Sequence, residues 1–163
     1  MRTIIPICCG VLMMYSPVIL AEDDWSGASL DRLEAKIQKK DKEGIIKPYA
    51  EMLFRRVIAE VEAKGGDKEK YAPYVARLKV AARNIAEDSY KIFCESIASM
   101  ADARRNGQKV TEEDGGIILA YMTAWAAADP QNPMSDQDRL KRFDKHVDKL
   151  DAIVLRRLER QKQ

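Results

Sequence analysis

The sequence predicts an all-α fold, a helical bundle of four main helices plus a short N-terminal helix. Three observations predict it. Residues 71–106 place apolar side chains at every third or fourth position, and after Pro73 this stretch contains neither glycine nor proline, which is typical of one long amphipathic helix. The composition, 46% hydrophobic and 33% charged with only 7% aromatic residues, is that of a helix-rich globular chain. No run alternates apolar and polar residues as a strand does.

The first 21 residues have the pattern of a secretory signal peptide. Arg2 supplies a positive start, an uncharged run follows, and acidic residues come directly after Ala21. We therefore expect a cleavable signal at residues 1–21 and a mature chain, residues 22–163, that forms a single all-helical domain. Its expected location is the periplasm or the exterior of the cell, with no stable membrane insertion after signal cleavage.

Two alternatives concern the same leader. A retained membrane anchor is less favoured because the run is short for a span and is broken by Pro6 and Pro17. A lipid on Cys8 or Cys9 is less favoured because the apolar run before them is too short. After cleavage only Cys94 remains, so no intramolecular disulfide can form. A homodimer bridged through Cys94 stays open, although a half-buried free thiol is the favoured interpretation.

In chain order, Ser29 can cap a short helix that runs to Glu43, and Gly44 is expected to end it. A second helix is predicted over residues 46–64, with Pro48 in its first turn, where a backbone N–H is not needed. The apolar stripe of this second helix is two residues wide, which is typical of a helix packed against two neighbours. The stripe consists of Ile46, Tyr49, Ala50, Leu53, Phe54, Val57, Ile58 and Val61.

After a loop at residues 65–72, the long helix is predicted from Pro73 to Asn106. At 1.5 Å per residue it would be roughly 50 Å long. A helix of that length is not stable alone in water, so other segments must pack along it. Its predicted buried face consists of Val75, Leu78, Ala82, Ile85, Ala86, Tyr90, Phe93, Ile97 and Met100.

A fourth helix is predicted over residues 111–128. Thr111 can cap it, and Asp114 stands three residues later, as in a capping box with Asp in place of Glu. From Gly115 to Ala128 the sequence is uncharged and apolar on nearly every side. In a soluble protein such a helix is central and surrounded by other helices.

Tyr121 and Trp125 are four residues apart on this central helix and therefore share a face. The pair is the candidate pocket of the sequence, because two aromatic side chains on one face can line a site for a small ligand. Packing in the core is the favoured interpretation of the same pair.

The last helix is predicted over residues 135–160, capped by Ser135 with Asp138 three residues on. Its apolar line repeats at three-and-four spacing through Leu140, Phe143, Val147, Leu150, Val154 and Leu158. The basic end of the chain is interpreted as a frayed helix terminus, where cations complement the helix dipole. A functional basic patch there is the less favoured alternative.

Catalytic and metal-binding chemistry finds little support in the sequence. His146 is the sole histidine, and no nucleophile motif accompanies it. Zinc with cysteine and histidine ligands and a carboxylate-bridged metal pair both need more ligands than His146 and Cys94 can provide. We therefore expect a protein that is not an enzyme and that has no metal or cofactor. Haem held by His146 and a methionine is kept as an alternative.

The formal charge of +2 with nearly balanced acids and bases does not suggest nucleic-acid binding. The sequence therefore predicts an exported, non-enzymatic protein of the periplasm that acts by binding another protein. It would be an inhibitor or immunity protein, or an assembly factor or adaptor of an envelope machine. The alternative is a periplasmic carrier of a small ligand or of b-type haem. No recognisable motif identifies the partner.

Overall fold

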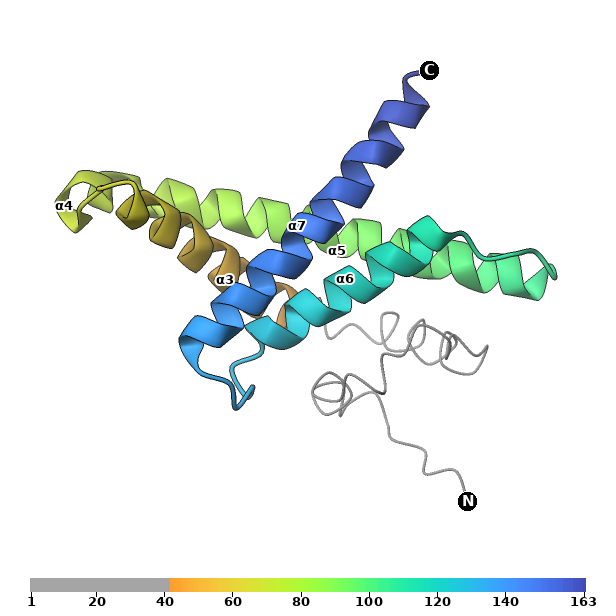
Figure 1. Cartoon of the computed structure of the whole chain (residues 1–163), viewed down its shortest axis with the longest axis horizontal. Coiled ribbons are helices and arrows are strands. Elements are labelled where there is room, and N and C mark those ends of the chain that lie inside the picture. Colours follow the sequence, from red (N-terminus) through yellow and green to blue (C-terminus); the bar gives the residue numbers. More distant parts are fainter. Residues whose placement is uncertain (1–41) are drawn as a thin grey trace.

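The computed structural model describes residues 42–163, and every regular element within that range is a helix. The elements are α3 (Lys42–Ala63), α4 (Lys68–Tyr71), the 3₁₀ turn η2 (Ala72–Tyr74), α5 (Val75–Arg105), α6 (Glu112–Ala128) and α7 (Asp136–Gln161) (Figure 1). The predicted all-α bundle with four main helices is thereby confirmed. The predicted short helix at residues 29–43 lies outside the described residues apart from its last two positions, and so does the predicted signal at residues 1–21.

The bundle consists of two antiparallel helix pairs. In the first pair, Glu43 at the start of α3 binds Arg83 in α5, while Tyr71, just before α5, donates a hydrogen bond to Glu62 at the end of α3. In the second pair, α6 and α7 run side by side in opposite directions and make the most extensive helix contact of the described chain. Helix α6 touches all three other long helices, as its uncharged sequence predicts.

All four long helices contribute to one aromatic centre. The ring of Tyr121 in α6 stacks on Tyr49 of α3 and on Phe93 of α5, with centroids 5.0 and 4.5 Å away. Phe143 of α7 meets Tyr49 edge to face at 5.0 Å. Offset-stacked and edge-to-face pairs are the favoured geometries of aromatic rings. These four side chains are nearly inaccessible to solvent, so they form the middle of the core.

The buried face of α5 differs from the prediction at three positions, since Val75 and Leu78 are only partly buried and Ile85 is exposed. The exposed fraction of Ile85 is 53%, whereas the small residues Ala82 and Ala86 are buried. Successive residues turn by about 100° around a helix, so Ile85 lies roughly 60–100° away from these two alanines. Helix α5 packs against both α3 and α6, and small side chains such as these two alanines allow helix backbones to come near each other. Phe93, by contrast, is buried as predicted.

The start of α3 also corrects the prediction. A helix break was expected at Gly44, but the described helix runs from Lys42 through Gly44, and Pro48 stands in its second turn. A proline ring inside a helix crowds the carbonyl four residues earlier, which here belongs to Gly44. Burial of Ile45 and Ile46 offsets the cost of about 1 kcal/mol that a glycine in a helix carries. Within the predicted loop at residues 65–72, the short helix α4 forms as well.

The other helix ends form close to where the sequence places them. Gly65 and Gly107 have φ of +82° and +65°, the left-handed conformation that glycine adopts readily after a helix. The predicted caps are confirmed too: the amide of Asp114 donates to the Oγ1 of Thr111 at 3.1 Å, and the amide of Asp138 donates to the Oγ of Ser135 at 3.2 Å. Each cap hydroxyl donates in turn to the carboxylate three residues on.

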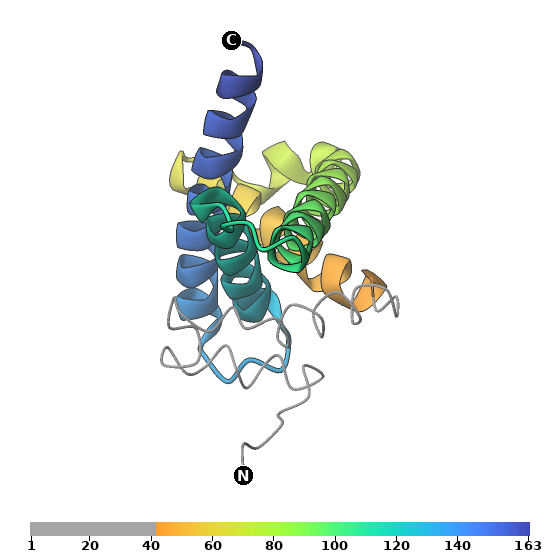
Figure 2. The same ribbon diagram turned by 90° about the vertical axis from the view of Figure 1, so that its right-hand side faces the viewer.

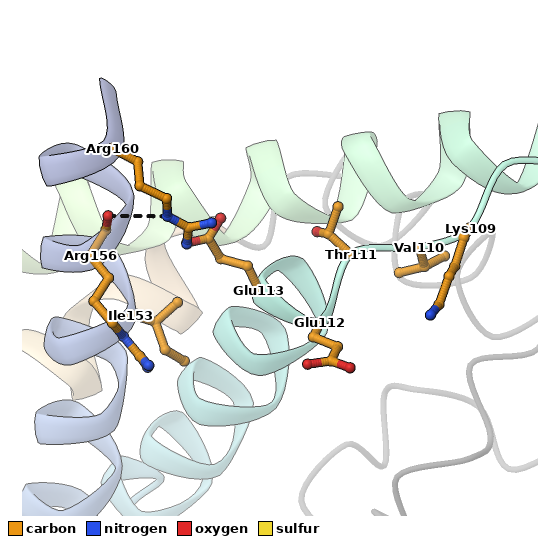
Figure 3. Close-up of a pocket in the computed structure, with 8 residues that line it drawn as sticks. All are labelled: Lys109, Val110, Thr111, Glu112, Glu113, Ile153, Arg156 and Arg160. Carbon is orange, nitrogen blue, oxygen red and sulfur yellow. Dashed lines mark hydrogen bonds and ion pairs between the residues drawn. The ribbon is translucent and has the colours of Figure 1, made fainter. Parts of the chain in front are cut away.

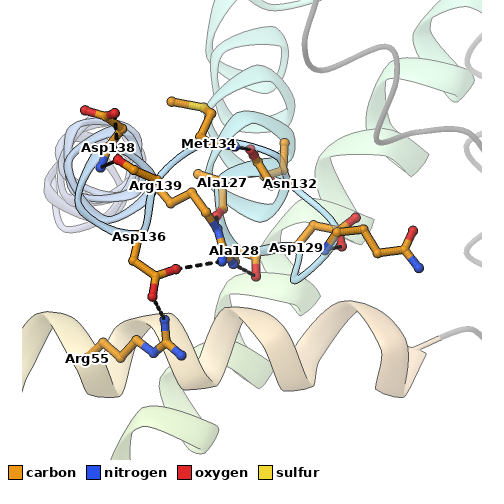
Figure 4. A network of polar contacts seen from close by, with 12 residues as sticks. Arg55, Ala127, Ala128, Asp129, Asn132, Met134, Asp136, Asp138 and Arg139 are labelled. Atoms are coloured by element: carbon orange, nitrogen blue, oxygen red, sulfur yellow. Dashed lines mark hydrogen bonds and ion pairs between the residues drawn. The ribbon is translucent and has the colours of Figure 1, made fainter.

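The connection between α6 and α7 is held by buried polar groups (Figure 4). Arg139 of α7, which is only 8% exposed, donates to the last carbonyl oxygens of α6, those of Ala127 and Ala128, at 2.9 Å each. Asn132 donates to the carbonyl of Ala126 at 2.8 Å. The carbonyls of Ala127 and Ala128 lie at the end of α6, where no further helical N–H follows, so a buried cation at this negative end of the dipole stabilises the end of α6.

The C-terminal end of α7 projects beyond the other helices in both views (Figures 1 and 2). Helix α7 has 26 residues and its antiparallel partner α6 has 17. At 1.5 Å per residue, α7 is therefore longer by roughly 13 Å. Its apolar line is buried at Phe143, Val147 and Leu150 as predicted, but Leu158 is 47% exposed, against the prediction. At Leu158 the apolar line is therefore not covered by the other described helices.

Candidate interaction surface

The uncovered apolar surface at the end of α7 consists of Leu155 and Leu158, which are 59% and 47% exposed. The two residues are three apart and so lie next to each other on the helix surface. Ile153 and Val154, one turn earlier, still pack against the core. Single exposed apolar residues are common on proteins, but an adjacent pair at the end of a projecting helix is a candidate contact for a partner.

This end of α7 is fastened by ion pairs to the first turn of α6. Arg157 donates to the buried carboxylate of Asp114 at 2.7 Å and contacts Glu113 at 3.4 Å, and Arg160 donates to Glu113 at 2.6 Å. Acidic residues are favourable in the first turn of a helix, so α6 supplies both the charges and a dipole for them. We name these four residues the α6–α7 clamp. Two of the basic residues at this end, Arg157 and Arg160, are thus ion-paired, and α7 continues to Gln161.

Asp114 is the buried centre of the clamp, with 5% of its surface exposed. Its carboxylate accepts hydrogen bonds from Thr111 at 2.8 Å, from Ser99 of α5 at 2.9 Å and from Arg157. Burial by itself raises the pKa of a carboxyl, but these hydrogen bonds and the charge of Arg157 outweigh it, so the pKa of Asp114 lies below its ordinary value. Asp114 is therefore ionised at neutral pH and joins three helices.

Two polar grooves border the clamp. The larger, of about 620 Å³, lies between the start of α6 and the end of α7 (Figure 3). The smaller, of about 480 Å³, lies between the clamp and α5. The larger groove is lined by Lys109, Val110, Thr111, Glu112, Glu113, Ile153, Arg156 and Arg160. Acidic and basic side chains both line each groove, so each groove offers charged hydrogen-bonding groups of either sign to a partner or ligand.

The two residues of the predicted ligand pocket, Tyr121 and Trp125, lie in different environments. Tyr121 is 1% exposed and lies between the rings of Tyr49 and Phe93, while Trp125 is partly exposed and packs against the core. Burial raises the pKa of Tyr121 well above its ordinary value, so its hydroxyl stays protonated. Neither residue lines the two grooves beside the clamp. A ligand pocket at this pair stays a prediction.

The sole histidine lies at the edge of the core. His146 is partly exposed, and its buried Nδ1 has no hydrogen-bond partner among the described residues. Burial first, and then the charges of Lys149, Arg142 and Lys145, lower its pKa to about 4. The ring is therefore neutral at neutral pH. Within residues 42–163 no three histidine, cysteine, aspartate or glutamate side chains gather as a metal site would require.

Cys94, on α5, is a free half-buried thiol within the described chain. Burial raises its pKa, and a hydrogen bond with Tyr90 acts in the opposite direction. A raised pKa leaves little of the reactive thiolate at neutral pH. A homodimer through this thiol stays a prediction.

Sequence reasoning missed the exposed leucine pair, since it placed Leu158 in the buried line and did not single out Leu155. The available signal was that the predicted central helix is shorter than the predicted last helix, but a difference in length does not identify which residues of the longer helix are uncovered. None of the helices among residues 42–163 combines the length and the apolar character needed to cross a bilayer. Comparisons with family models, with curated proteins and with solved structures find no match. A proposal about function therefore rests on the sequence and on the geometry of the described residues.

Proposed function

We propose that this protein is an exported, non-enzymatic interaction protein that binds another protein through the end of α7. The observation that carries the proposal is the exposed pair Leu155 and Leu158 on a helix end that projects from the bundle (Figure 1). Its role would be that of an inhibitor or immunity protein, or of an assembly factor or adaptor in the cell envelope.

The α6–α7 clamp supports this proposal because it holds the leucine pair in place before any partner arrives. Arg157 and Arg160, on either side of Leu158 in the sequence, are bound to α6. A contact that is already ordered loses less conformational entropy on binding, and so more of its burial contributes to affinity. Buried apolar anchors surrounded by charged residues are also the usual anatomy of a protein interface.

Export and the lack of catalysis rest on the sequence. The pattern of residues 1–21 supports export, and the single histidine without a nucleophile motif supports a non-enzymatic role.

A matched pair of double variants tests the proposal. Tagged wild type, Leu155→Ser with Leu158→Ser, and Val80→Ser with Ile85→Ser are expressed in the native host and isolated from the envelope fraction. Val80 and Ile85 are also exposed, at 61% and 53%, but lie on α5. We expect one partner to co-purify with the wild type and the α5 variant and to be lost from the α7 variant. Recovery of the same partner with a folded α7 variant would refute the proposal.

The second candidate function is a carrier of a small ligand or of b-type haem. It is favoured by one observation, the neutral and partly exposed ring of His146 with a buried nitrogen that has no partner. A neutral imidazole is the form that binds haem iron. Absorbance of the purified protein with added haem tests it: a sharp Soret band that disappears in His146→Ala would support the carrier, and an unchanged spectrum of free haem would reject it.

A further inference from the structure

A second groove lies on another part of the bundle, between α3 and α5, with a volume of about 420 Å³. Ala50 and Phe54, both partly buried, give it an apolar floor. Lys47 and Arg55 stand on its α3 side and Lys79 on its α5 side. No residue of the α6–α7 clamp lines it, so this groove is separate from the surface at the end of α7.

The charges of this groove are not balanced. Arg83, which also lines it, is held by Glu43 at 2.6 Å and by Glu87 at 2.8 Å, so it serves the fold. Within the described part of the chain, by contrast, neither Lys47 nor Lys79 has an acidic partner within 4 Å, and the charge of Lys47 acts on Glu43 at longer range. The ammonium of Lys79 instead lies 5.4 Å from the centre of the Phe54 ring.

The third cation, Arg55, has only a long contact of 3.8 Å with Asp136, and both side chains are mostly exposed. Glu51 is the acid that faces these cations from within the groove. The groove therefore offers an excess of positive charge around an aromatic floor, which favours an acidic occupant that also carries an apolar side chain.

We propose that the groove between α3 and α5 binds an acidic peptide segment of a partner protein in an extended conformation. Lys47 and Arg55 are eight residues apart on α3, which corresponds to roughly 12 Å along the helix. Four residues of an extended chain cover roughly the same distance, since each adds about 3.3 Å. Alternate residues of an extended chain point to one side, so the pattern Asp-x-Leu-x-Asp places both carboxylates and the leucine towards the groove.

Geometry and charge distinguish this occupant from other anionic partners. Glu51 lies midway between Lys47 and Arg55 in the sequence of α3, where it would repel a continuous polyanion such as single-stranded nucleic acid or an anionic lipid surface. A peptide with two separated carboxylates places an uncharged residue at that point. The inference does not depend on the surface at the end of α7.

Fluorescence anisotropy with two labelled peptides tests the proposal on the protein as it is recovered from the cell envelope. One peptide contains Asp-Ser-Leu-Ser-Asp, and the control peptide contains Asn-Ser-Leu-Ser-Asn. We expect the acidic peptide to bind at least tenfold more tightly than the control, and binding to weaken as salt is added, because charge-assisted hydrogen bonds contribute most of the affinity. Equal binding of the two peptides, or no binding of the acidic one, would overturn the proposal.

Variants then locate the site. Lys79→Glu is expected to weaken binding of the acidic peptide at least tenfold, while Lys91→Glu, the same change on an exposed part of α5 about 18 Å away, leaves it within twofold. Phe54→Ala removes the apolar floor without changing charge and should also weaken binding. Circular dichroism of each variant confirms that it is folded. Binding of the peptide that is insensitive to both Lys79→Glu and Phe54→Ala would place the site elsewhere.

Binding of an oligonucleotide or of anionic vesicles that depends on Lys79, without binding of the peptide, would show that the proposed class of partner is wrong.

Discussion

At the scale of single residues, the position of a side chain around its helix decides its role. Phe93 and Ile85 belong to the same helix and to the same predicted apolar face. The structure buries Phe93 against Tyr121 and leaves Ile85 half exposed. The burial of a side chain therefore predicts how much the free energy of unfolding falls when that side chain is truncated.

Phe93→Ala should lower the free energy of unfolding by about 3–5 kcal/mol, because it removes a buried ring and leaves a cavity. Ile85→Ala should lower it by about 0.5 kcal/mol or less, as substitutions on the surface usually do. Urea denaturation of the two variants beside the wild type measures both values. Similar losses in the two variants would show that the buried side of α5 is assigned wrongly.

His146 gives the protein a pH dependence of known sign. Its pKa in the folded protein is about 4, below the ordinary value of 6.5. The unfolded chain thus takes up a proton at higher pH than the folded protein does, so this residue's contribution to stability is fully present above pH 6.5 and is lost as the pH falls towards 4. Because the chain has one histidine, NMR titration of a single imidazole signal measures the value. A midpoint near 6.5 would contradict the partial burial.

His146→Ala should leave the binding function intact, since the proposed contacts lie on the end of α7 and the ring has no role in them. The variant should also lose the part of the pH dependence that His146 contributes, so its stability should fall less between pH 6.5 and 4 than that of the wild type. Loss of partner binding with normal circular dichroism would show that His146 takes part in the partner contact and would contradict a contact confined to the end of α7.

At the scale of helices, the pairing of α6 with the longer α7 is the feature that creates an exposed end. The clamp turns this end into an ordered surface, and Asp114 is its buried member. An unpaired buried cation or acceptor is costly, so the clamp depends on both of its sides being present.

Asp114→Asn tests the clamp and its pH dependence together. Asparagine keeps the shape of the side chain but loses the charge that pairs with Arg157, and we expect a loss of about 1–3 kcal/mol in the free energy of unfolding at pH 7. The pKa of Asp114 is lowered in the folded protein, so its stabilisation is present above the ordinary pKa of 3.8 and disappears as the pH falls below it. The difference between variant and wild type should therefore shrink below pH 4. A difference that is constant from pH 7 to pH 3 would argue against ionic stabilisation.

At the scale of the whole molecule, the features that could be predicted from the sequence are those that depend on residues close together in the chain. The helix ends at Gly107, Thr111 and Ser135 have causes within a few residues, namely a left-handed glycine and two hydroxyl caps. The apolar character of α6 predicted its contacts with three neighbours, because no other arrangement would cover all its sides.

What the sequence could not predict depends on partners distant along the chain. The side of α5 that becomes buried depends on where α3 and α6 approach it, so Ile85 could not be distinguished from Ala82 or Ala86. The exposure of Leu158 depends on where α6 begins. The groove that combines Lys47 with Lys79 exists only once α3 and α5 are paired, and no spacing in the sequence brings these two lysines together.

Export of the whole chain is a prediction that an intact-mass measurement tests. Protein recovered from the periplasm should have an intact mass that corresponds to residues 22–163, because cleavage is expected after Ala21. A mass that includes residues 1–21 would show a retained leader. An added lipid mass on Cys8 or Cys9 would replace the cleavage prediction with a lipoprotein.

Site-specific photo-crosslinking in the living host tests most directly whether the end of α7 contacts a partner. A photoreactive phenylalanine analogue is placed at Leu158 in one strain and, as a matched control, at the similarly exposed Val80 of α5 in another. We predict that irradiation yields a discrete crosslinked product with one other protein from position 158 and no such product from position 80. No product from position 158, or the same product at equal yield from position 80, would contradict a partner contact at the end of α7.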